Sequence, residues 1–179
     1  MFYSTTYESP LGLITLASDG QSLTGLWLAG QKYHGDTIFT TLTENNTLPI
    51  FTAAQNWLER YFNNNQPPIS ELPLAPVGSA FRQSVWKILI QIPYGQVITY
   101  GDIAKKMAAQ LSKKTMSSQA VGGAVGHNPI SIIIPCHRVV GSNGSLTGYA
   151  GGIPLKIKLL ELEGVDMSRL FVPKKGTAL

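Results

Sequence analysis

The first 30 residues carry short apolar runs separated by turn-forming residues, a pattern that predicts β-strands. Ser9-Pro10 separates the first run from the second. Asp19-Gly20, a strong β-hairpin signal, separates the second from the third. The three expected strands, rich in β-branched, aromatic and leucine residues, cover residues 2–7, 11–17 and 23–28.

A stretch rich in Asn and Pro follows the first helical pattern. Residues 52–62 have aromatic and leucine side chains at helical spacing, which predicts an amphipathic helix with these residues in the core. Residues 63–78 then contain three consecutive Asn, four Pro and a Gly. Because this composition neither continues a helix nor joins the centre of a sheet, we expect a linker there, between domains of residues 1–76 and 77–179.

Helical periodicity dominates the second half. Ser79, Thr99 and Ser117 each precede an apolar-periodic segment and are expected to be N-caps. Two short helices joined by a tight turn form the helix-turn-helix pattern. The expected helices end near Gln91, near Leu111 and near Gly126, and a last one covers residues 154–163 with Pro154 near its first position.

Charge is distributed unevenly along the chain. Before residue 77 the chain has two Lys or Arg and six Asp or Glu. From residue 77 on it has twelve Lys or Arg and four Asp or Glu. This asymmetry favours contact between the second half and a polyanion such as DNA, although a solvated basic surface is an equally simple reading of charge alone.

No apolar run approaches the ~20 residues of a membrane helix, and MFYSTTYESP lacks the features of a secretion signal. The one cysteine excludes an intramolecular disulfide and a multi-cysteine zinc site, and suits a reducing compartment. We therefore expect a cytoplasmic protein with no membrane partner. His34 with scattered acids is more typical of a loop than of a metal site, and no metal or cofactor is expected.

The candidate chemistry lies where Ile132, Ile133 and Ile134 lead to Pro135-Cys136-His137-Arg138-Val139. The isoleucine run predicts a buried strand that ends in a Gly-rich loop and places reactive groups beside a rigid element. Basic surroundings favour a cysteine thiolate, but a lone cysteine is also often an inert core residue.

If Cys136 is the nucleophile, His137 can act as its base through a water molecule. A carboxylate should orient the imidazole. Glu163 is the first candidate, with Asp166 and Glu161 as alternatives.

This segment resembles the O6-alkylguanine-DNA alkyltransferase family, whose signature is Pro-Cys-His-Arg-Val. The similarity covers about residues 79–165, in order and at the family's spacing. It includes Tyr94-Gly95, Val97-Ile98-Thr99-Tyr100, Ala120-Val121-Gly122-Gly123-Ala124, Asn128-Pro129, Gly148-Tyr149-Ala150-Gly151-Gly152, Leu159-Leu160 and Glu163-Gly164.

The resemblance implies a two-domain α/β (α+β) protein, with an N-terminal ribonuclease H-like domain and a C-terminal winged helix-turn-helix-like domain. It implies single-turnover transfer of an alkyl group from O6-alkylguanine in DNA to Cys136, and leaves O4-alkylthymine open as a second substrate. His137 would activate Cys136 through water, Glu163 would orient His137, Tyr100 would donate a proton to guanine O6, and Asn128 would fix the turn before the active-site segment. Arg138 would be structural.

The resemblance also implies a mode of DNA binding. The expected helix after Ser117 offers small residues, which favours shape-dominated contact in the minor groove over base reading. Reaching O6 requires flipping the nucleotide out of the duplex. The family usually has an arginine before the Ala-Val-Gly-Gly run, whereas this chain has Gln119. The residues expected to contact DNA or substrate are Gln119, Ala120, Gly122, Gly123, Lys113, Lys114, Ser117, Val139, Tyr149 and Ala150.

The expected partner is double-stranded DNA carrying alkylated guanine, bound by a protein that is monomeric away from DNA.

Two other classes of function remain as alternatives. A lesion sensor would bind without repairing, but relatives of that kind lack the cysteine. A Cys-His hydrolase would turn over repeatedly, yet the chain has no separate oxyanion-hole motif.

Overall fold

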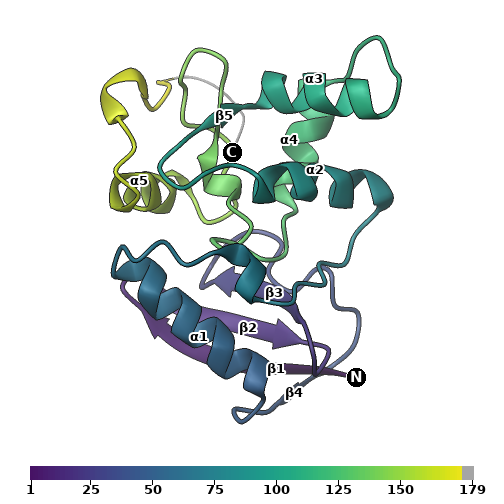
Figure 1. Cartoon of the computed structure of the whole chain (residues 1–179), viewed down its shortest axis with the longest axis vertical. Helices are drawn as coiled ribbons and strands as arrows, with labels where there is room; N and C mark the ends of the chain where they lie inside the picture. The colour runs from purple at the N-terminus through teal and green to yellow at the C-terminus, as the bar shows by residue number, and fades with distance from the viewer. Residues whose placement is uncertain (175–179) are drawn as a thin grey trace. The chain divides into compact units, whose positions relative to one another are not determined.

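The computed structural model describes residues 1–174 and contains two compact units. Unit 1 consists of Met1–Gly78 together with Pro129–Ile133. Unit 2 consists of Ser79–Asn128 and the described residues from Ile134 onward. The chain therefore leaves unit 2 after Asn128, contributes five residues to unit 1 and then returns (Figure 1).

Unit 1 is built on a four-stranded sheet with the order β3-β2-β1-β4. β1 and β2 are antiparallel, as are β2 and β3, while β4 runs parallel to β1. The Asp19 carboxylate accepts hydrogen bonds from the amides of Gln21 and Ser22, which closes the predicted hairpin turn. The three predicted strands are confirmed and a short fourth is added: β1 (Phe2–Ser9), β2 (Gly12–Ser18), β3 (Leu23–Leu28) and β4 (Leu42–Glu44).

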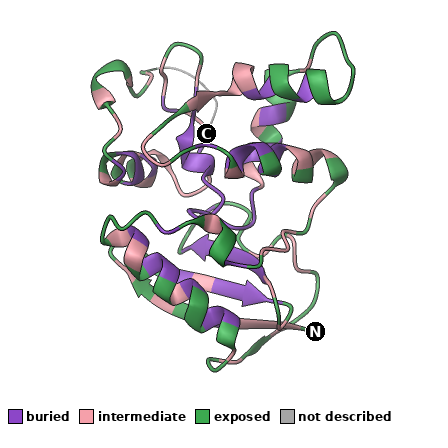
Figure 2. Cartoon of the chain, viewed as in Figure 1, coloured by how far each residue is buried: buried purple, intermediate pink, exposed green. Residues whose placement is uncertain are grey.

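Helix α1 (Pro49–Phe62) packs against the sheet (Figure 1). It begins three residues earlier than predicted, because Pro49 has the fixed φ and missing N–H that suit a first helical turn. Phe51, Trp57 and Tyr61 are in the core, and the rings of the last two stack with centroids 5.5 Å apart. The prediction of a core position is wrong for Phe62, which is only partly buried. Figure 2 shows the buried positions on α1 and along the strands of unit 1.

Much of the Pro-rich stretch 63–78 is fixed to unit 1. It contains the 3-10 helix η1 (Ile69–Glu71), and the Trp57 indole donates to the Pro68 carbonyl at 3.1 Å. Leu23 bonds through its amide to Pro73 and through its carbonyl to the Ala75 amide. These bonds explain how a segment with little regular structure still has a defined path.

Unit 2 holds the predicted helices, and all three predicted N-caps are confirmed. The Ser79 and Ser117 hydroxyls accept from backbone amides three residues on, and Thr99 forms a reciprocal capping box with Asp102. Helices α2, α3 and α4 contact one another. The elements are α2 (Ala80–Ile90), α3 (Tyr100–Gln110), α4 (Ser118–Gly126), α5 (Ile153–Leu162), the 3-10 helices η2 (Cys136–Arg138) and η3 (Met167–Arg169), and the parallel pair β5 (Ile98–Thr99) and β6 (Val139–Val140).

The buried strand predicted over Ile132–Ile134 is wrong. The three isoleucines are fully buried but lie in a turn that ends in a bend at Ile134, and Ile132 has a φ of 69°. Pairing with β3 is limited to one bridge between Leu26 and Ile130, after which the Ser131 amide bonds to the Leu26 carbonyl. The apolar run predicted burial correctly, but with no continuing ladder the chain turns and enters η2.

No helix within residues 1–174 is both long enough and apolar enough to cross a bilayer.

Candidate active site

Cys136 opens helix η2 in a segment where every residue from 134 to 140 is buried (Figure 2). Asn128, two residues beyond the end of α4, holds it there. Its side-chain amide donates to the Ile134 carbonyl at 2.7 Å and to the Cys136 sulfur at 3.1 Å. Asn128 thus connects the end of α4 to the nucleophile candidate.

The electrostatic setting of Cys136 combines two opposing effects. Burial raises the pKa of the thiol, since the side chain is only 4% exposed. The Asn128 amide, the positive charge of Lys156 and the backbone amides of residues 136 and 137 act in the other direction. These groups all favour negative charge on the sulfur once a base removes its proton.

The His137 imidazole is fully buried, and its Nε2 lies 2.6 Å from Oε1 of Glu163. The carboxylate accepts a hydrogen bond from the Nε2–H group, so the lone pair of the neutral ring is on Nδ1. Nδ1 has no hydrogen-bond partner among the described residues. Burial lowers the pKa of His137, against the effect of Glu163, so the ring is neutral and able to accept a proton there.

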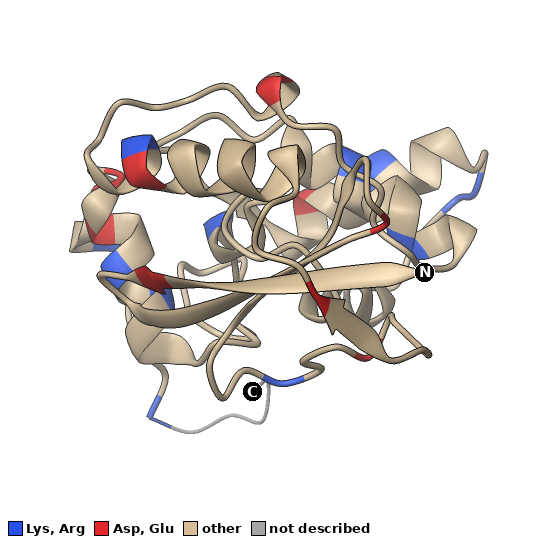
Figure 3. Cartoon of the chain, turned by 90° about the horizontal axis from the view of Figure 1, so that it is seen from below, with Lys and Arg blue, Asp and Glu red and all other residues tan. Residues whose placement is uncertain are grey.

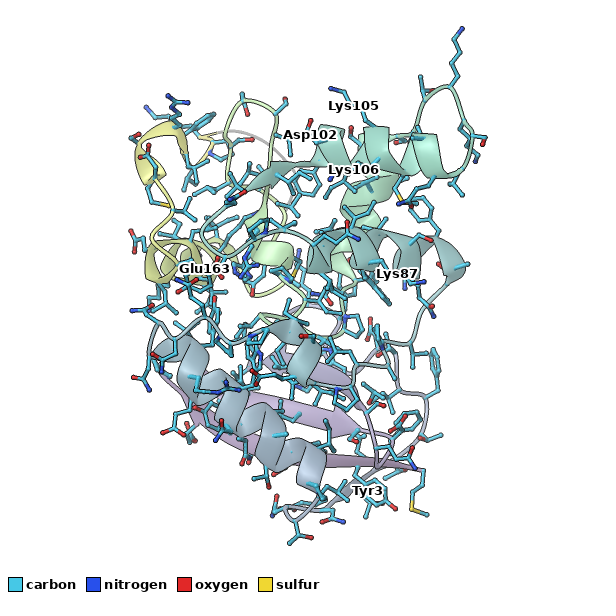
Figure 4. The ribbon with its side chains drawn as sticks, in the orientation of Figure 1. Tyr3, Lys87, Asp102, Lys105, Lys106 and Glu163 are labelled. Atoms are coloured by element: carbon cyan, nitrogen blue, oxygen red, sulfur yellow. The ribbon has the colours of Figure 1, made fainter. Side chains whose placement is uncertain are left out.

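Glu163 also binds Arg138. The Arg138 guanidinium donates Nε to Oε2 at 2.8 Å and Nη2 to Oε1 at 3.0 Å, and its Nη1 donates to the Ile92 carbonyl. Burial alone would raise the pKa of Glu163, but the hydrogen bonds and charges of His137 and Arg138 hold it well below its ordinary value. The carboxylate at His137 is therefore Glu163, labelled in Figure 4, rather than Glu161 or Asp166.

Two tyrosines belong to the same region. The Tyr100 hydroxyl lies 3.1 Å from the Thr147 carbonyl and 3.2 Å from the Gly148 carbonyl. The Tyr149 hydroxyl is buried and has no hydrogen-bond partner among residues 1–174. Burial raises the pKa of both phenols well above the ordinary value. Both are therefore neutral and able to donate a hydrogen bond.

The residues expected to contact DNA lie mainly on exposed surface of unit 2. On α4, Gln119, Ala120 and Gly123 are exposed, whereas Val121 and Ala124 point into the core. A Cβ added at Gly122 would lie 3.9 Å from the Tyr100 ring, so this helix also passes beside the candidate site.

The remaining expected contacts are placed less uniformly. Lys113 and Lys114 are exposed in the turn between α3 and α4, where Figure 3 shows basic residues. Ser117 is exposed and caps α4. Val139 is fully buried, and Ala150 is half-buried beside Tyr149. The structure thus separates the exposed Lys113, Lys114 and Ser117 from Val139, which is buried, and Ala150, which is half-buried.

Sequence reasoning missed Lys156, which is fully buried on α5. A signal was available, because Lys156 stands at helical spacing with Ile153, Ile157 and Leu160 on an otherwise apolar face. Burial lowers the pKa of Lys156 to about 8.

The arrangement is suited to nucleophilic transfer. It combines a thiol, a neutral imidazole held by a carboxylate, and phenol donors, most of them buried away from water. Within residues 1–174 no cluster of three or more His, Cys, Asp or Glu side chains could hold a metal ion.

Comparison with known proteins gives two family matches and several close relatives. A family model described as "6-O-methylguanine DNA methyltransferase, ribonuclease-like domain" matches residues 2–76, and one described as "6-O-methylguanine DNA methyltransferase, DNA binding domain" matches residues 80–165. The methylated-DNA–protein-cysteine methyltransferase of Haemophilus influenzae is 41% identical over 163 residues, covering 91% of this chain and 87% of that protein. Its namesake from Mycobacterium tuberculosis is 43% identical over 164 residues, covering 91% and 93%.

Among solved structures, the crystal structure of Mycobacterium tuberculosis OGT in complex with DNA has a TM-score of 0.78 to this chain. The two chains are 41% identical, and 94% of each is covered. These matches confirm the predicted two-domain fold, with a ribonuclease-like first domain and a DNA-binding second domain.

Proposed function

The chain belongs to the 6-O-methylguanine DNA methyltransferase family, and we propose that it repairs DNA by transferring the alkyl group of O6-alkylguanine irreversibly to Cys136. The observation that carries the proposal is the buried contact chain in which Asn128 binds the Cys136 sulfur and Glu163 binds His137, the residue next to it. A structural cysteine needs neither a neutral imidazole nor a carboxylate beside it.

The transfer is a displacement at the alkyl carbon. His137 Nδ1 takes the thiol proton, directly or through one water molecule, and the Cys136 sulfur forms a bond to carbon as the bond from carbon to O6 breaks. The bonding electron pair stays with the purine. The purine then takes up one proton, so the proton lost by the thiol is balanced and guanine leaves neutral.

Tyr100 is the candidate donor at O6. Its raised pKa makes it a weak acid, so its main contribution would be a hydrogen bond to the oxygen as charge develops there. In this structure its hydroxyl is bonded to the carbonyls of Thr147 and Gly148. Substrate binding would therefore have to replace those acceptors with the base.

The reaction should occur once per protein molecule. The product on Cys136 is a thioether, which has no activated carbonyl for water to attack. Neither His137 nor Glu163 can therefore regenerate the thiol by hydrolysis, and the number of lesions repaired equals the number of protein molecules.

Access of the substrate to Cys136 requires movement of both the DNA and the protein. Because the side chain is 4% exposed, a guanine stacked within a duplex could not approach the sulfur. We infer that the alkylated nucleotide is flipped out of the helix. The segment from Thr147 to Gly152, which contains the buried Tyr149, would shift to admit it.

DNA is the partner that the DNA-binding family domain supports. We propose that α4 enters the minor groove with its exposed face of Gln119, Ala120 and Gly123, whose small side chains permit close backbone approach. Lys113 and Lys114 would contact phosphates, and Gln119 would occupy the place left by the flipped nucleotide.

The protein would be a monomer when it is not bound to DNA. It would act in the cytoplasm, where a free thiol stays reduced.

One experiment separates this function from its alternatives. The full chain is incubated with a duplex oligonucleotide containing O6-methylguanine, and intact mass is measured for wild type and Cys136→Ala. The proposal expects the wild type to gain one methyl group on Cys136, with a stoichiometric endpoint, and the variant to gain none. Binding without mass gain would instead identify a lesion sensor, and repeated turnover would identify a hydrolase.

A further inference from the structure

Lys156 is a buried cation that the proposed chemistry has not yet used. It lies on α5, on the face that packs Leu160 into a hydrophobic cluster with Val140 and Leu146. Its side chain is fully buried, and an ammonium group is expensive to remove from water unless specific partners compensate. The position of this charge therefore depends on specific partners inside unit 2.

The contacts of Lys156 lead to the candidate active site. Its Nζ donates to the carbonyls of Val139 and Thr147, the latter at 2.8 Å. The Thr147 carbonyl also accepts from the Tyr100 hydroxyl at 3.1 Å. The Thr147 carbonyl thus accepts from both Lys156 on α5 and Tyr100 at the start of α3. The second acceptor of Lys156, the Val139 carbonyl, belongs to the residue that directly follows helix η2, which carries Cys136.

The buried positive and negative charges around Lys156 do not cancel. Arg138 and Glu163 form a buried ion pair that cancels internally, and His137 is neutral. No Asp or Glu of residues 1–174 forms an ion pair with Lys156, whose two acceptors are both neutral carbonyls. The buried group thus retains one unbalanced positive charge. Because burial holds the pKa of the Tyr100 and Tyr149 phenols well above the ordinary value, Cys136 is the side chain of this region that ionises more readily. Consistent with this, Lys156 lowers the pKa of Cys136, and Cys136 in turn raises that of Lys156.

We propose that Lys156 is a positioning residue for the alkyl transfer: it holds the Thr147 carbonyl at which Tyr100 is bound and serves as the counter-charge against which the Cys136 thiolate forms. The inference rests on the proposed function and assigns a role in it to a residue outside the Cys136–His137–Glu163 series. Lys156 need not touch the substrate, because it acts through the sulfur and through the segment containing Thr147.

The test compares Lys156→Met, which keeps the aliphatic stem, with Lys156→Arg, which keeps the charge. Lys158→Met is the matched control, since Lys158 is an exposed lysine on the same helix. Two rates are measured against pH on the full chain. The rate of carbamidomethylation by iodoacetamide reports thiolate at Cys136, and the rate of reaction with free O6-benzylguanine reports the complete transfer.

Loss of a close opposite charge should raise the midpoint of the iodoacetamide profile by about one pH unit or more in Lys156→Met. The rate near neutral pH should accordingly fall about tenfold. Lys156→Arg should restore the midpoint, and Lys158→Met should not change it. With O6-benzylguanine, the rate of Lys156→Met should fall by at least the same factor, because the transfer begins from the same Cys136 thiolate.

A folded Lys156→Met with an unchanged iodoacetamide midpoint would overturn the proposal, because a merely structural lysine alters stability without moving the thiol pKa. If Lys156→Met does not fold, the same coupling is measured from the other side, by NMR titration of the lysine amines in wild type and Cys136→Ala. The Lys156 midpoint should be lower in Cys136→Ala, and equal midpoints would again overturn the proposal. A wild type that accepts no alkyl group would refute the proposed function, yet the iodoacetamide profiles would still decide the role of Lys156.

Discussion

His137 and Glu163 are joined by a hydrogen bond in which Nε2 and Oε1 lie 2.6 Å apart, and neither side chain is exposed. Because Nε2 donates its hydrogen to the carboxylate in a hydrogen bond, this contact decides which nitrogen carries the lone pair and leaves Nδ1 available as a base. The same carboxylate compensates the buried Arg138 guanidinium. One side chain at the end of α5 thus serves both the chemistry and the stability of unit 2.

Replacing Glu163 by Gln should therefore reduce both the unfolding free energy and the rate of methyl transfer. The amide keeps the shape but leaves the Arg138 charge buried without a counter-charge, which costs about 3–5 kcal/mol of unfolding free energy. The rate of methyl transfer should also fall, since His137 loses the group that fixes its tautomer. Urea unfolding and time-resolved intact mass measure the two effects. Glu161→Gln, at an exposed position two residues earlier, is the control and should match wild type.

Stability should decrease with acid in two stages. Burial lowers the pKa of His137 in the folded protein, and the contacts of Glu163 lower its pKa as well. In both cases the unfolded chain binds more protons than the native state as pH falls. The free energy of unfolding should thus begin to fall below about pH 6.5 and fall further below about pH 4.3, the ordinary values of the two groups.

Urea unfolding at several pH values tests this dependence. His137→Gln should have a shallower slope than wild type in the first stage, because it removes the imidazole that must be protonated. Equal unfolding free energies for the wild type at about pH 7.5 and about pH 5.5 would contradict the assignment of a buried neutral histidine.

Replacing Gln119 by Arg should accelerate repair of duplex DNA. Gln119 is exposed near the start of α4, and guanidinium would add a charge and a flat stacking surface at the place left by a flipped nucleotide. Reaction with free O6-benzylguanine needs no flipping and should barely change. Parallel rate measurements with both substrates test the idea, and an equal effect on the two would reject a role for Gln119 in extrusion.

Removing the charges of Lys113 and Lys114 should reduce the salt dependence of DNA binding. If both exposed lysines contact phosphates, their double replacement by Gln lowers the slope of log affinity against log salt by about 2. The comparison variant replaces Lys105 and Lys106 on α3, because Lys105 faces Asp102 at 4.0 Å and projects from the helix (Figure 4). An unchanged slope in the first variant would assign Lys113 and Lys114 to solvent.

Local signals in the sequence were sufficient for most elements. Asp19-Gly20 predicted the hairpin because its geometry depends on neighbouring residues alone. Ser79, Thr99 and Ser117 predicted three helix starts for the same reason, since a cap bonds to amides two or three residues away. The strand expected over Ile132–Ile134 was wrong because strand formation needs a partner, and among residues 1–174 no further partner continues the ladder beyond Leu26.

For this protein, the sequence by itself determined the family, the helices of unit 2 and the Cys136-His137 pair, because each depends on residues that are close together along the chain. Only the tertiary structure decided that Glu163 rather than Glu161 or Asp166 binds His137, that Arg138 shares this carboxylate, and that Lys156 is buried with two carbonyls as acceptors. The physical reason is that hydrogen bonds and buried charges act over a few ångströms of space, and packing sets which distant residues come within that range.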